Sequence, residues 1–483
     1  MKKILIFVFL FLITVNCFAE DLYVCASGDG QGSTNGADWD NCFDGLSDVS
    51  WGSGAGALGA GDTLYVDGGA SSKSYGALNI AGSGTSESRI TIKIGQDANH
   101  NGTANFASIS FVQQDYITID GEYSGTRKFA TTGLVSSGGG GPVETPILKY
   151  VTVTRTSGGD TNEANDPAVD MRWSANAEIA YNLFDIRGSL YGVALNLSAP
   201  AHSRAYSQAS VHHNTIYITG RLNDGSGPDG IHNAFGYDIY NNTIQAFAGS
   251  TANTSQHQDL VQSPDGHSKV YNNTFIDSGD SQFDVDNGTG AWQHLYLYNN
   301  VFVRTVDTMG TVGFRAYFYT STNDVRIDNN TFVDAARTGS SYGAAVSLSG
   351  SGTVTDATFR NNLLYNCGDT YDAILIQGAS DYEDWDSSNN LLNAGSEGNT
   401  TIGGSFPNVN GQSGAPSFVS YTPYSLSNDY NLASGDTAAK DNGVDLSAYF
   451  TTDKDGNTRS GTWDIGAYEF GTPTNAITGV NIN

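Results

Sequence analysis

The sequence predicts an all-β solenoid, a parallel β-helix, and three observations carry this prediction. One phrase recurs eight times at intervals of 27 to 32 residues: a short β-prone run, an asparagine, and a second short apolar run. A period of this length indicates a repeat architecture. Within each repeat, apolar residues alternate at period two over four to six residues, which favours strands over the helices of helical repeats. The repeated asparagines are Asn182, Asn214, Asn242, Asn273, Asn300, Asn330, Asn362 and Asn390.

An asparagine at the same point of every repeat predicts a turn that stacks on itself. Asparagine tolerates left-handed backbone angles and bonds its neighbours through its side-chain amide. Coils of a β-solenoid stack about 4.8 Å apart, so each side-chain carbonyl meets the next amide and the row becomes an internal ladder. Residues 211–218 and 296–303 show the strand pattern. A propeller, the competing repeat fold, is typified by Trp-Asp phrases rather than stacked asparagines.

On these residues the chain resembles the right-handed parallel β-helix, or pectin-lyase-like, superfamily. The asparagine rows sit where that family turns between its second and third sheets. Residues 21–97 look like its usual entrance, and the ending Asp453-Lys454-Asp455-Gly456-Asn457, followed by Trp463-Asp464-Ile465-Gly466, is similar to the close of many secreted β-helix proteins. The resemblance covers almost the whole mature chain and implies the fold. It leaves the chemistry open, because the superfamily hosts lyases, hydrolases, epimerases and non-catalytic surface proteins.

The chain divides into five expected segments. Residues 1–19 have the features of a secretory signal peptide: two lysines, an apolar run over 4–15 and small residues before a cleavage point after Ala19. The alternative, a lipoprotein signal acylated on Cys17, is disfavoured by Asn16, which occupies a position that normally needs a small residue. We expect the N-terminal cap and first coils at 20–110, β-helix coils at 111–415, a C-terminal coil or cap at 416–470 and a flexible tail at 471–483.

The charge balance excludes some partners. The precursor carries 22 basic and 50 acidic residues, and loss of Lys2 and Lys3 takes its net charge from -28 to -30. Such a chain repels nucleic acid, and no apolar stretch beyond the signal reaches the length of a membrane span. Each coil of a solenoid buries its core against its neighbours, so one long domain is reasonable. We expect a secreted protein that acts on an extracellular polysaccharide as a monomer.

Three cysteines remain after processing. Cys25 and Cys42 lie in the loop-rich entrance of a secreted protein, where a disulfide that closes this loop is the natural use. Cys367 is left over, and we expect it to pack as a small buried hydrophobe.

A candidate site must lie on an outer sheet face, because the interior of a β-helix is filled. Long insertions near 221–228, 249–256 and 277–281 each lead into a strand that opens with polar residues. Counting back from the ladder asparagine, Asp229 is 13 residues before Asn242, and Asp259 and Asp286 are each 14 before theirs. We therefore predict that these three acids stack on consecutive coils. The nearby polar residues are His232, His257, Gln262 and Asp284, with Arg315 and Arg172 on flanking coils.

Two interpretations of the acidic row stay open at this stage. Acidic residues at strand starts often satisfy turn amides, and some align by chance in a chain rich in Gly, Asp and Asn. In a functional interpretation, carboxylates on adjacent coils stand about 5 Å apart, near the gap of a retaining glycosidase pair, and carboxylates two coils apart approach the gap of an inverting pair. A hydrolase would pair Asp259 with Asp284 or Asp286. The same oxygens offer a calcium site with Asp229, Asp259, Asp284 and Asp286 as ligands.

The resemblance to β-helix lyases implies a further possibility. In those enzymes calcium or another cation binds the uronate carboxylate, and an arginine or lysine removes the adjacent proton. Arg315 would be this base, with His232, His257 or Tyr317 as alternative acids or bases. Arg172 and Gln262 would bind substrate. No residue here matches a family motif, so these roles rest on geometry.

We rank three functions on this basis. A calcium-assisted lyase on an anionic polysaccharide comes first, although the shortage of Lys and Arg along the proposed cleft weighs against it. A glycoside hydrolase follows closely. A non-catalytic adhesin or matrix-binding solenoid is the alternative from another class.

Overall fold

The computed structural model describes part of the chain, and all structural statements below concern this part. The described residues are 19–137, 143–155, 167–187, 193–197, 209–219, 229–232, 236–247, 258–263, 268–286, 293–306, 312–335, 344–368, 372–378, 382, 384–395, 400–403 and 406–471.

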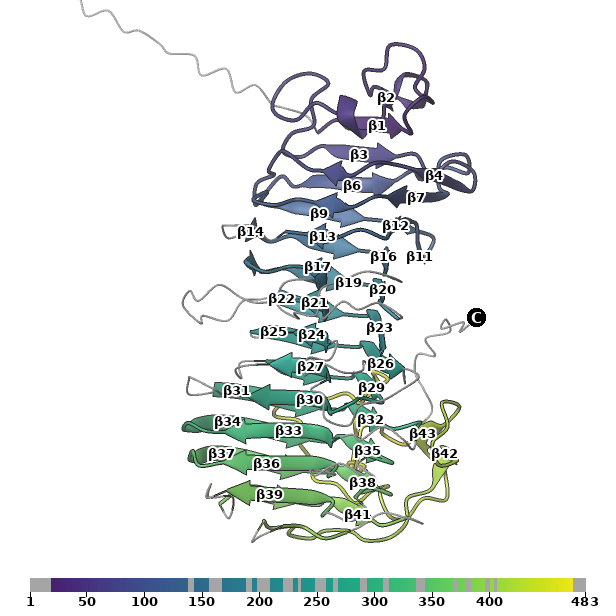
Figure 1. Ribbon diagram of the computed structural model, residues 1–483. Helices are drawn as coiled ribbons and strands as arrows, with labels where there is room; N and C mark the ends of the chain where they lie inside the picture. The colour runs from purple at the N-terminus through teal and green to yellow at the C-terminus, as the bar shows by residue number, and fades with distance from the viewer. Residues whose placement is uncertain are drawn as a thin grey trace, which may run out of the picture.

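The chain folds into a parallel β-helix, as predicted, in which successive coils stack along one axis (Figure 1). Each coil contributes a strand to each of three sheets, and parallel crossovers of this kind are right-handed. A coil passes from sheet 1 through the asparagine turn to sheet 2, then to sheet 3, and returns to sheet 1 one strand further along. Within the described residues, helical structure is limited to two short 3-10 turns, η1 (Trp39–Asn41) and η2 (Leu46–Asp48).

Sheet 1 has fourteen strands. In spatial order they are β2 (Phe43–Asp44), β1 (Asp21–Cys25), β3 (Thr63–Val66), β6 (Ile90–Ile94), β9 (Ile117–Asp120), β15 (Ile147–Lys149), β19 (Glu178–Ala180), β22 (Ala209–His212), β25 (Tyr237–Tyr240), β28 (Lys269–Tyr271), β31 (Gln293–Tyr298), β34 (Thr322–Asp328), β37 (Val354–Arg360) and β40 (Asp386–Ser388).

Sheet 2 has twelve strands. They are β4 (Ser72–Ser74), β7 (Thr103–Phe106), β12 (Phe129–Thr131), β16 (Val151–Thr154), β20 (Leu183–Asp185), β23 (Thr215–Thr219), β26 (Thr243–Phe247), β29 (Thr274–Ile276), β32 (Val301–Val303), β35 (Thr331–Val333), β38 (Leu363–Tyr365) and β41 (Leu391–Asn393).

Sheet 3 has eleven strands and carries the candidate site. They are β5 (Leu78–Asn79), β8 (Ile109–Ser110), β13 (Val135–Ser136), β17 (Pro167–Asp170), β21 (Val193–Asn196), β24 (Asp229–His232), β27 (Asp259–Ser263), β30 (Ser281–Asp286), β33 (Val312–Phe318), β36 (Val346–Gly350) and β39 (Ile374–Gly378). Three two-stranded pairs complete the structure: β10 (Glu122–Tyr123) with β11 (Thr126–Arg127), β14 (Val143–Glu144) with β18 (Ser174–Ala175), and β42 (Phe418–Ser420) with β43 (Asp429–Leu432).

The asparagine ladder is confirmed. All eight repeated asparagines are buried, and each side-chain amide donates to the side-chain carbonyl of the next, as in the 3.0 Å bond from Asn273 to Asn300. The backbone N–H of each asparagine donates to the same oxygen, at 3.0 Å for this pair. One further member follows the eighth, because Asn390 donates to Asn408 at 3.2 Å. The row satisfies buried backbone groups at a turn where no strand can.

The residue before each ladder asparagine turns the chain. It has φ between 52° and 59° in all eight repeats, the left-handed region that asparagine tolerates best. This bend corrects one expectation: 211–218 and 296–303 are not single strands. Each contains the end of a sheet 1 strand, the ladder turn and the start of a sheet 2 strand.

The C-terminal segment runs back along the flank of the solenoid rather than stacking as another coil. Leu432, Ala439 and Ile465 pack on Leu363 and Leu391 of sheet 2. The outward asparagines of the ladder turn hold its backbone, with Asn299 donating to the Thr452 carbonyl at 2.7 Å, Asn329 to Asp464 at 3.0 Å and Asn361 to Val444 at 2.8 Å.

The cysteines lie as predicted, with Cys25 bonded to Cys42 in the entrance loops and Cys367 buried. Burial raises the pKa of the Cys367 thiol, which suits a packing role. The expected signal peptide falls outside the described residues except for Ala19. Among the residues that are described, no helix has the length and apolarity needed to cross a bilayer.

Candidate functional site

One outward-facing column of sheet 3 is polar along most of its length. Strand register aligns one residue from each strand, and we call this set the polar row. Its members, from β5 to β33, are Asn79, Ser110, Ser136, Asp170, Asn196, His232, Gln262, Asp284 and Arg315.

The register corrects the predicted stack of three acids. Asp259 pairs with Ser281, whereas Asp286 pairs with Tyr317 further along the strand. Counting residues back from the ladder asparagine gave the wrong register because the segment that connects sheet 3 to sheet 1 is longer in this coil. Gln262 and Asp284 pair across the sheet, yet Gln262 precedes its ladder asparagine by 11 residues and Asp284 precedes its own by 16. The side chain of Asp286 and the whole of His257 lie outside the described residues.

Arg315 lies among three carboxylates. Its Nε donates to Asp284 Oδ1 at 2.6 Å, one Nη lies 2.8 Å from Asp280 Oδ2, and the same nitrogen lies 3.7 Å from Asp259 Oδ1. The side chains of Arg315, Asp284 and Asp259 are 5%, 1% and 0% exposed, whereas Asp280 is 26% exposed. We call these four residues the Arg315 cluster. Arg315 joins β33 to β30 and to the turn before β30 through charge-assisted hydrogen bonds, and it lies within ion-pair distance of Asp259 on β27.

The charges in this cluster set its protonation. Burial by itself lowers the pKa of Arg315, but Asp284, Asp259 and Asp280 outweigh it and leave that pKa raised. The three carboxylates therefore favour the charged form of the guanidinium. Burial, followed by the negative charge of Asp284, raises the pKa of Asp259 well above its usual range, although Arg315 opposes the shift. The cluster thus favours a protonated Asp259 beside an arginine-paired Asp284.

His232 and Asp229 form a second pair at the N-terminal side of the cluster. Nδ1 of His232 lies 2.7 Å from Asp229 Oδ2, and the imidazole is 14% exposed while Asp229 is fully buried. The other Asp229 oxygen accepts the N–H of Asp259 at 3.0 Å. Asp229 therefore orients the imidazole and connects it to the Arg315 cluster.

Tyr317 and Arg172 lie apart from His232. Tyr317 lies on β33, three strands from His232 on β24, which is about 14 Å at the usual strand spacing. Its ring centroid is 5.4 Å from the Arg315 guanidinium carbon, and burial raises its pKa to about 12. Arg172 sits four strands from Asp284 and pairs with Asp170 at 2.7 Å. Gln262 lies between His232 and Asp284 in the polar row.

Of the four predicted calcium ligands, Asp229, Asp259 and Asp284 have described side chains, and each is held by contacts within the protein. Asp229 is bonded to His232 and to the Asp259 N–H, and Asp259 Oδ1 accepts the Ser281 N–H at 3.1 Å. Asp284 is bonded to Arg315, whose guanidinium already supplies the positive charge among these carboxylates. In the described ranges no three His, Cys, Asp or Glu side chains gather as metal ligands.

Asp280 was missed by sequence reasoning. It lies in the 277–281 insertion, in the turn before β30, and the predicted acidic row contains strand residues alone. An acid within a long insertion beside a polar strand is the signal that could have found it.

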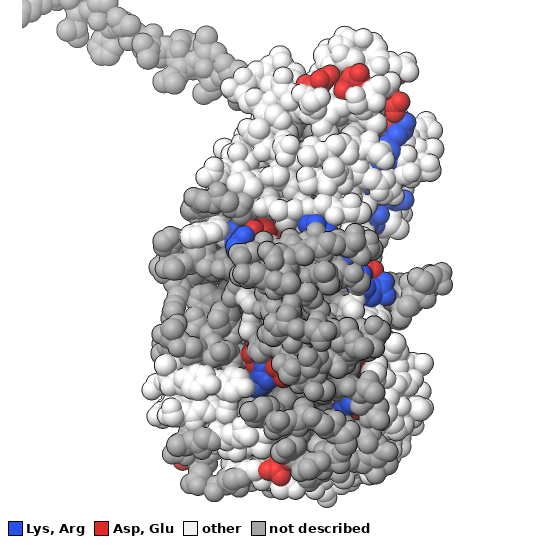
Figure 2. Space-filling model, in the orientation of Figure 1, with Lys and Arg blue, Asp and Glu red and all other residues white. Residues whose placement is uncertain are grey.

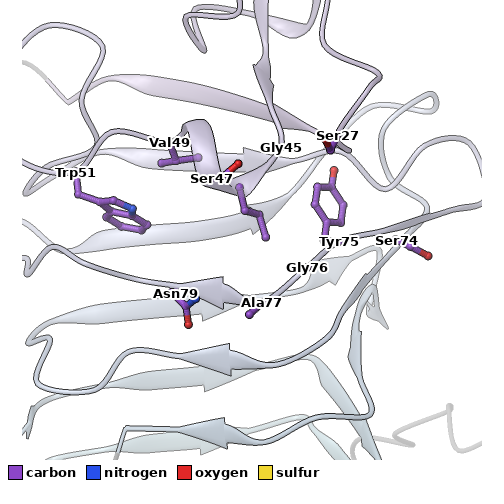
Figure 3. Close-up of a pocket in the computed structure, with 11 residues that line it drawn as sticks. Ser27, Gly45, Ser47, Val49, Trp51, Ser74, Tyr75, Gly76, Ala77 and Asn79 are labelled. Atoms are coloured by element: carbon purple, nitrogen blue, oxygen red, sulfur yellow. The ribbon is translucent and has the colours of Figure 1, made fainter.

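Three cavities lined by described residues lie elsewhere. The largest, about 570 Å³, is between the N-terminal cap and β5 (Figure 3). Cavities of about 240 and 260 Å³ lie under the C-terminal segment, beside sheets 1 and 2. None of the three is lined by Arg315. Figure 2 shows Lys or Arg atoms flanked by Asp or Glu at about the level of β30 and β33, on the face where sheet 3 lies.

Comparisons with known proteins give a match among solved structures and none by sequence. No protein-family model matches the chain, and no curated protein matches it. Among solved structures, it matches one described as the crystal structure of pectate lyase Pel9A, with 12% identity over 93% of this chain and 96% of that chain and a TM-score of 0.39. At this TM-score and identity the match carries no argument about the site or its chemistry.

Proposed function

We propose that the protein hydrolyses glycosidic bonds of an extracellular polysaccharide, with the Arg315 cluster as its catalytic centre. The observation that supports this most is the contact of one guanidinium with three carboxylates, of which Asp259 favours its protonated form. Glycoside hydrolysis needs one carboxylic acid and one carboxylate flanking the bond. Two carboxyl groups in different protonation states are the expected arrangement.

The spacing of the carboxyl groups agrees with this chemistry. Asp259 and Asp284 both contact one guanidinium, which allows the spacing of roughly 5 to 9.5 Å that covers retaining and inverting enzymes. Asp259 would protonate the leaving oxygen. Asp284, or the more exposed Asp280, would act as the ionised partner that activates water or attacks the sugar. Arg315 positions both and keeps its charge throughout.

The charge of the site favours a neutral or weakly charged sugar over a uronate. Asp259, Asp280 and Asp284 contact one guanidinium and Asp229 contacts His232 nearby, so an anionic chain would meet an excess of carboxylates. The raised pKa of Arg315 also opposes its use as the base of a lyase. These charges therefore favour a hydrolase over the lyase that the sequence analysis ranked first.

The test is turnover with two readouts. Purified protein would be incubated with neutral and acidic polysaccharides, and reducing ends would be measured with the absorbance near 235 nm that an unsaturated sugar produces. We expect reducing ends without new absorbance, and loss of reducing-end release in Asp284→Asn but not in Asp445→Asn, a change at an exposed site on the C-terminal segment. New absorbance would indicate a lyase, and silence of the wild type across the panel would favour a binding solenoid.

A further inference from the structure

The cavity of about 570 Å³ at the N-terminal end belongs to the same sheet as the Arg315 cluster. Asn79 of β5 lines it and is the first member of the polar row. Asp284 lies seven strands further along, about 34 Å away at the usual strand spacing. The cavity and the cluster therefore lie in register on one sheet.

The lining of this cavity has no charge. None of its 11 residues is acidic or basic, in a chain of net charge -28. Trp51 and Tyr75 supply aromatic surface, and Ser27, Ser47, Ser74 and Asn79 supply hydroxyl and amide groups (Figure 3). An apolar ring face beside small neutral polar groups suits a neutral sugar, whose C–H face stacks on aromatics while its hydroxyls bond around the rim.

The polar groups of the cavity are available to a ligand. The side chains of Ser27, Ser74 and Asn79 are exposed and make no hydrogen bond to the described part of the protein, and neither does the indole N–H of Trp51. Ser47 makes only a long contact of 3.4 Å with Asp48. The volume lies within the roughly 300–1,000 Å³ of ordinary small-molecule sites, enough for more than one sugar ring.

The walls of the cavity are held in place. Ser27 and Gly45 follow closely after the two cysteines of the Cys25–Cys42 disulfide, so this bond ties one wall to another. Gly45 has φ 99°, and a Cβ there would stand 3.2 Å from Ser27 Cβ, so glycine permits the close approach. Tyr75 donates its hydroxyl to the Asp67 carbonyl at 2.7 Å. A site held in this way pays a smaller ordering cost when it binds a ligand.

We infer that this cavity, hereafter the cap pocket, binds a neutral segment of the polysaccharide at a distance from the Arg315 cluster. The identity of the ligand as the enzyme's own substrate rests on the proposed function, whereas its neutral carbohydrate chemistry rests on the cavity alone. Several sugar residues would separate the two contacts, so the cap pocket would anchor long chains.

The experiment measures binding in the Asp284→Asn protein, which avoids turnover. Titration calorimetry would use neutral hexasaccharides of β-1,4-linked glucose, mannose and xylose and of α-1,5-linked arabinose, with hexagalacturonate as the charged comparison. We expect at least one neutral hexasaccharide to bind, and Trp51→Ala to weaken it at least tenfold. Trp39→Ala is the matched control, because Trp39 also lies in the cap but stacks on His100 with ring centroids 4.0 Å apart. Its binding should equal that of the parent.

Circular dichroism and melting temperature would establish that each variant is folded. The inference is overturned if no neutral hexasaccharide binds, if hexagalacturonate binds as tightly as the best neutral one, or if folded Trp51→Ala binds like the parent. Binding that depends on Trp51, in a protein whose wild type cleaves nothing, would retain the cap pocket and overturn the proposed function instead.

Discussion

The ladder turn and the outer face of sheet 3 are built on the same coils but use repetition in opposite ways. At the turn every coil from Asn182 to Asn390 presents the same buried side chain in the same bond. Along the polar row the residue changes from coil to coil, as in the sequence His232, Gln262, Asp284 and Arg315. The stacking that makes identical side chains a structural ladder also brings unlike side chains together for chemistry.

The largest expected effect is on turnover. Asp284→Asn keeps the shape of the side chain but removes its charge, so we expect the rate of reducing-end release to fall by about 10²–10⁴-fold. The melting temperature should change little by comparison. A variant that loses its fold and its activity together would place Asp284 with the ladder as a structural residue.

The second effect is on stability. Asn300→Ala removes a buried side chain that donates to Asn330 and accepts from Asn273, and it leaves buried partners unsatisfied. We expect a loss of about 1–3 kcal/mol in the free energy of unfolding, measured by urea denaturation, with turnover retained. Asn241→Gly is the control, because it keeps the left-handed turn and removes only an outward side chain. Equal losses in both variants would show that the ladder bonds add nothing.

The third effect is on the pH dependence of turnover. Asp259 must be protonated to act as an acid, so activity should fall as pH rises through its raised pKa. Asp229 contributes to that elevation, and Asp229→Asn should therefore move this alkaline limb to lower pH. The pH profile of kcat/KM is the measurement. A limb that stays in place, or moves upward, would contradict the assignment of Asp259.

The smallest effect concerns His213, a histidine at the outward position of the ladder turn, which six of the eight coils fill with asparagine. Burial and the neighbouring His212 lower the pKa of His213 to about 4. Between this pKa and the usual value of 6.5, His213 is protonated in the unfolded chain but neutral in the folded chain. The free energy of unfolding therefore falls as pH falls from 6.5 towards 4. His213→Asn should remove part of this loss, about 1 kcal/mol at pH 5 after allowance for solvent screening, seen as a higher melting temperature there. No gain at pH 5 relative to pH 8 would contradict this account.

The sequence was informative where the structure repeats and less so where it does not. The ladder, the strands and the Cys25–Cys42 bond follow from local patterns, because period, turn chemistry and loop composition fix them. The predicted position of Asp286 in the acidic row was wrong because the segment from sheet 3 to sheet 1 differs in length between coils. This difference shifts the register of β30 while the spacing of the ladder asparagines stays nearly constant. The Arg315 cluster joins residues on three coils, and Asp280 comes from a turn that no periodicity describes. Long-range side-chain geometry of this kind requires the register, which a count of residues along one chain does not contain.

Cleavage in water enriched in oxygen-18, followed by mass spectrometry of the products, tests the central claim most directly. Hydrolysis at the Arg315 cluster adds one water oxygen for each bond broken, so the new reducing ends should carry one heavy oxygen and should be absent with Asp284→Asn. New reducing ends without the label, together with new non-reducing ends that are lighter by one water, would show elimination. That result would contradict the assignment of this site to a hydrolase.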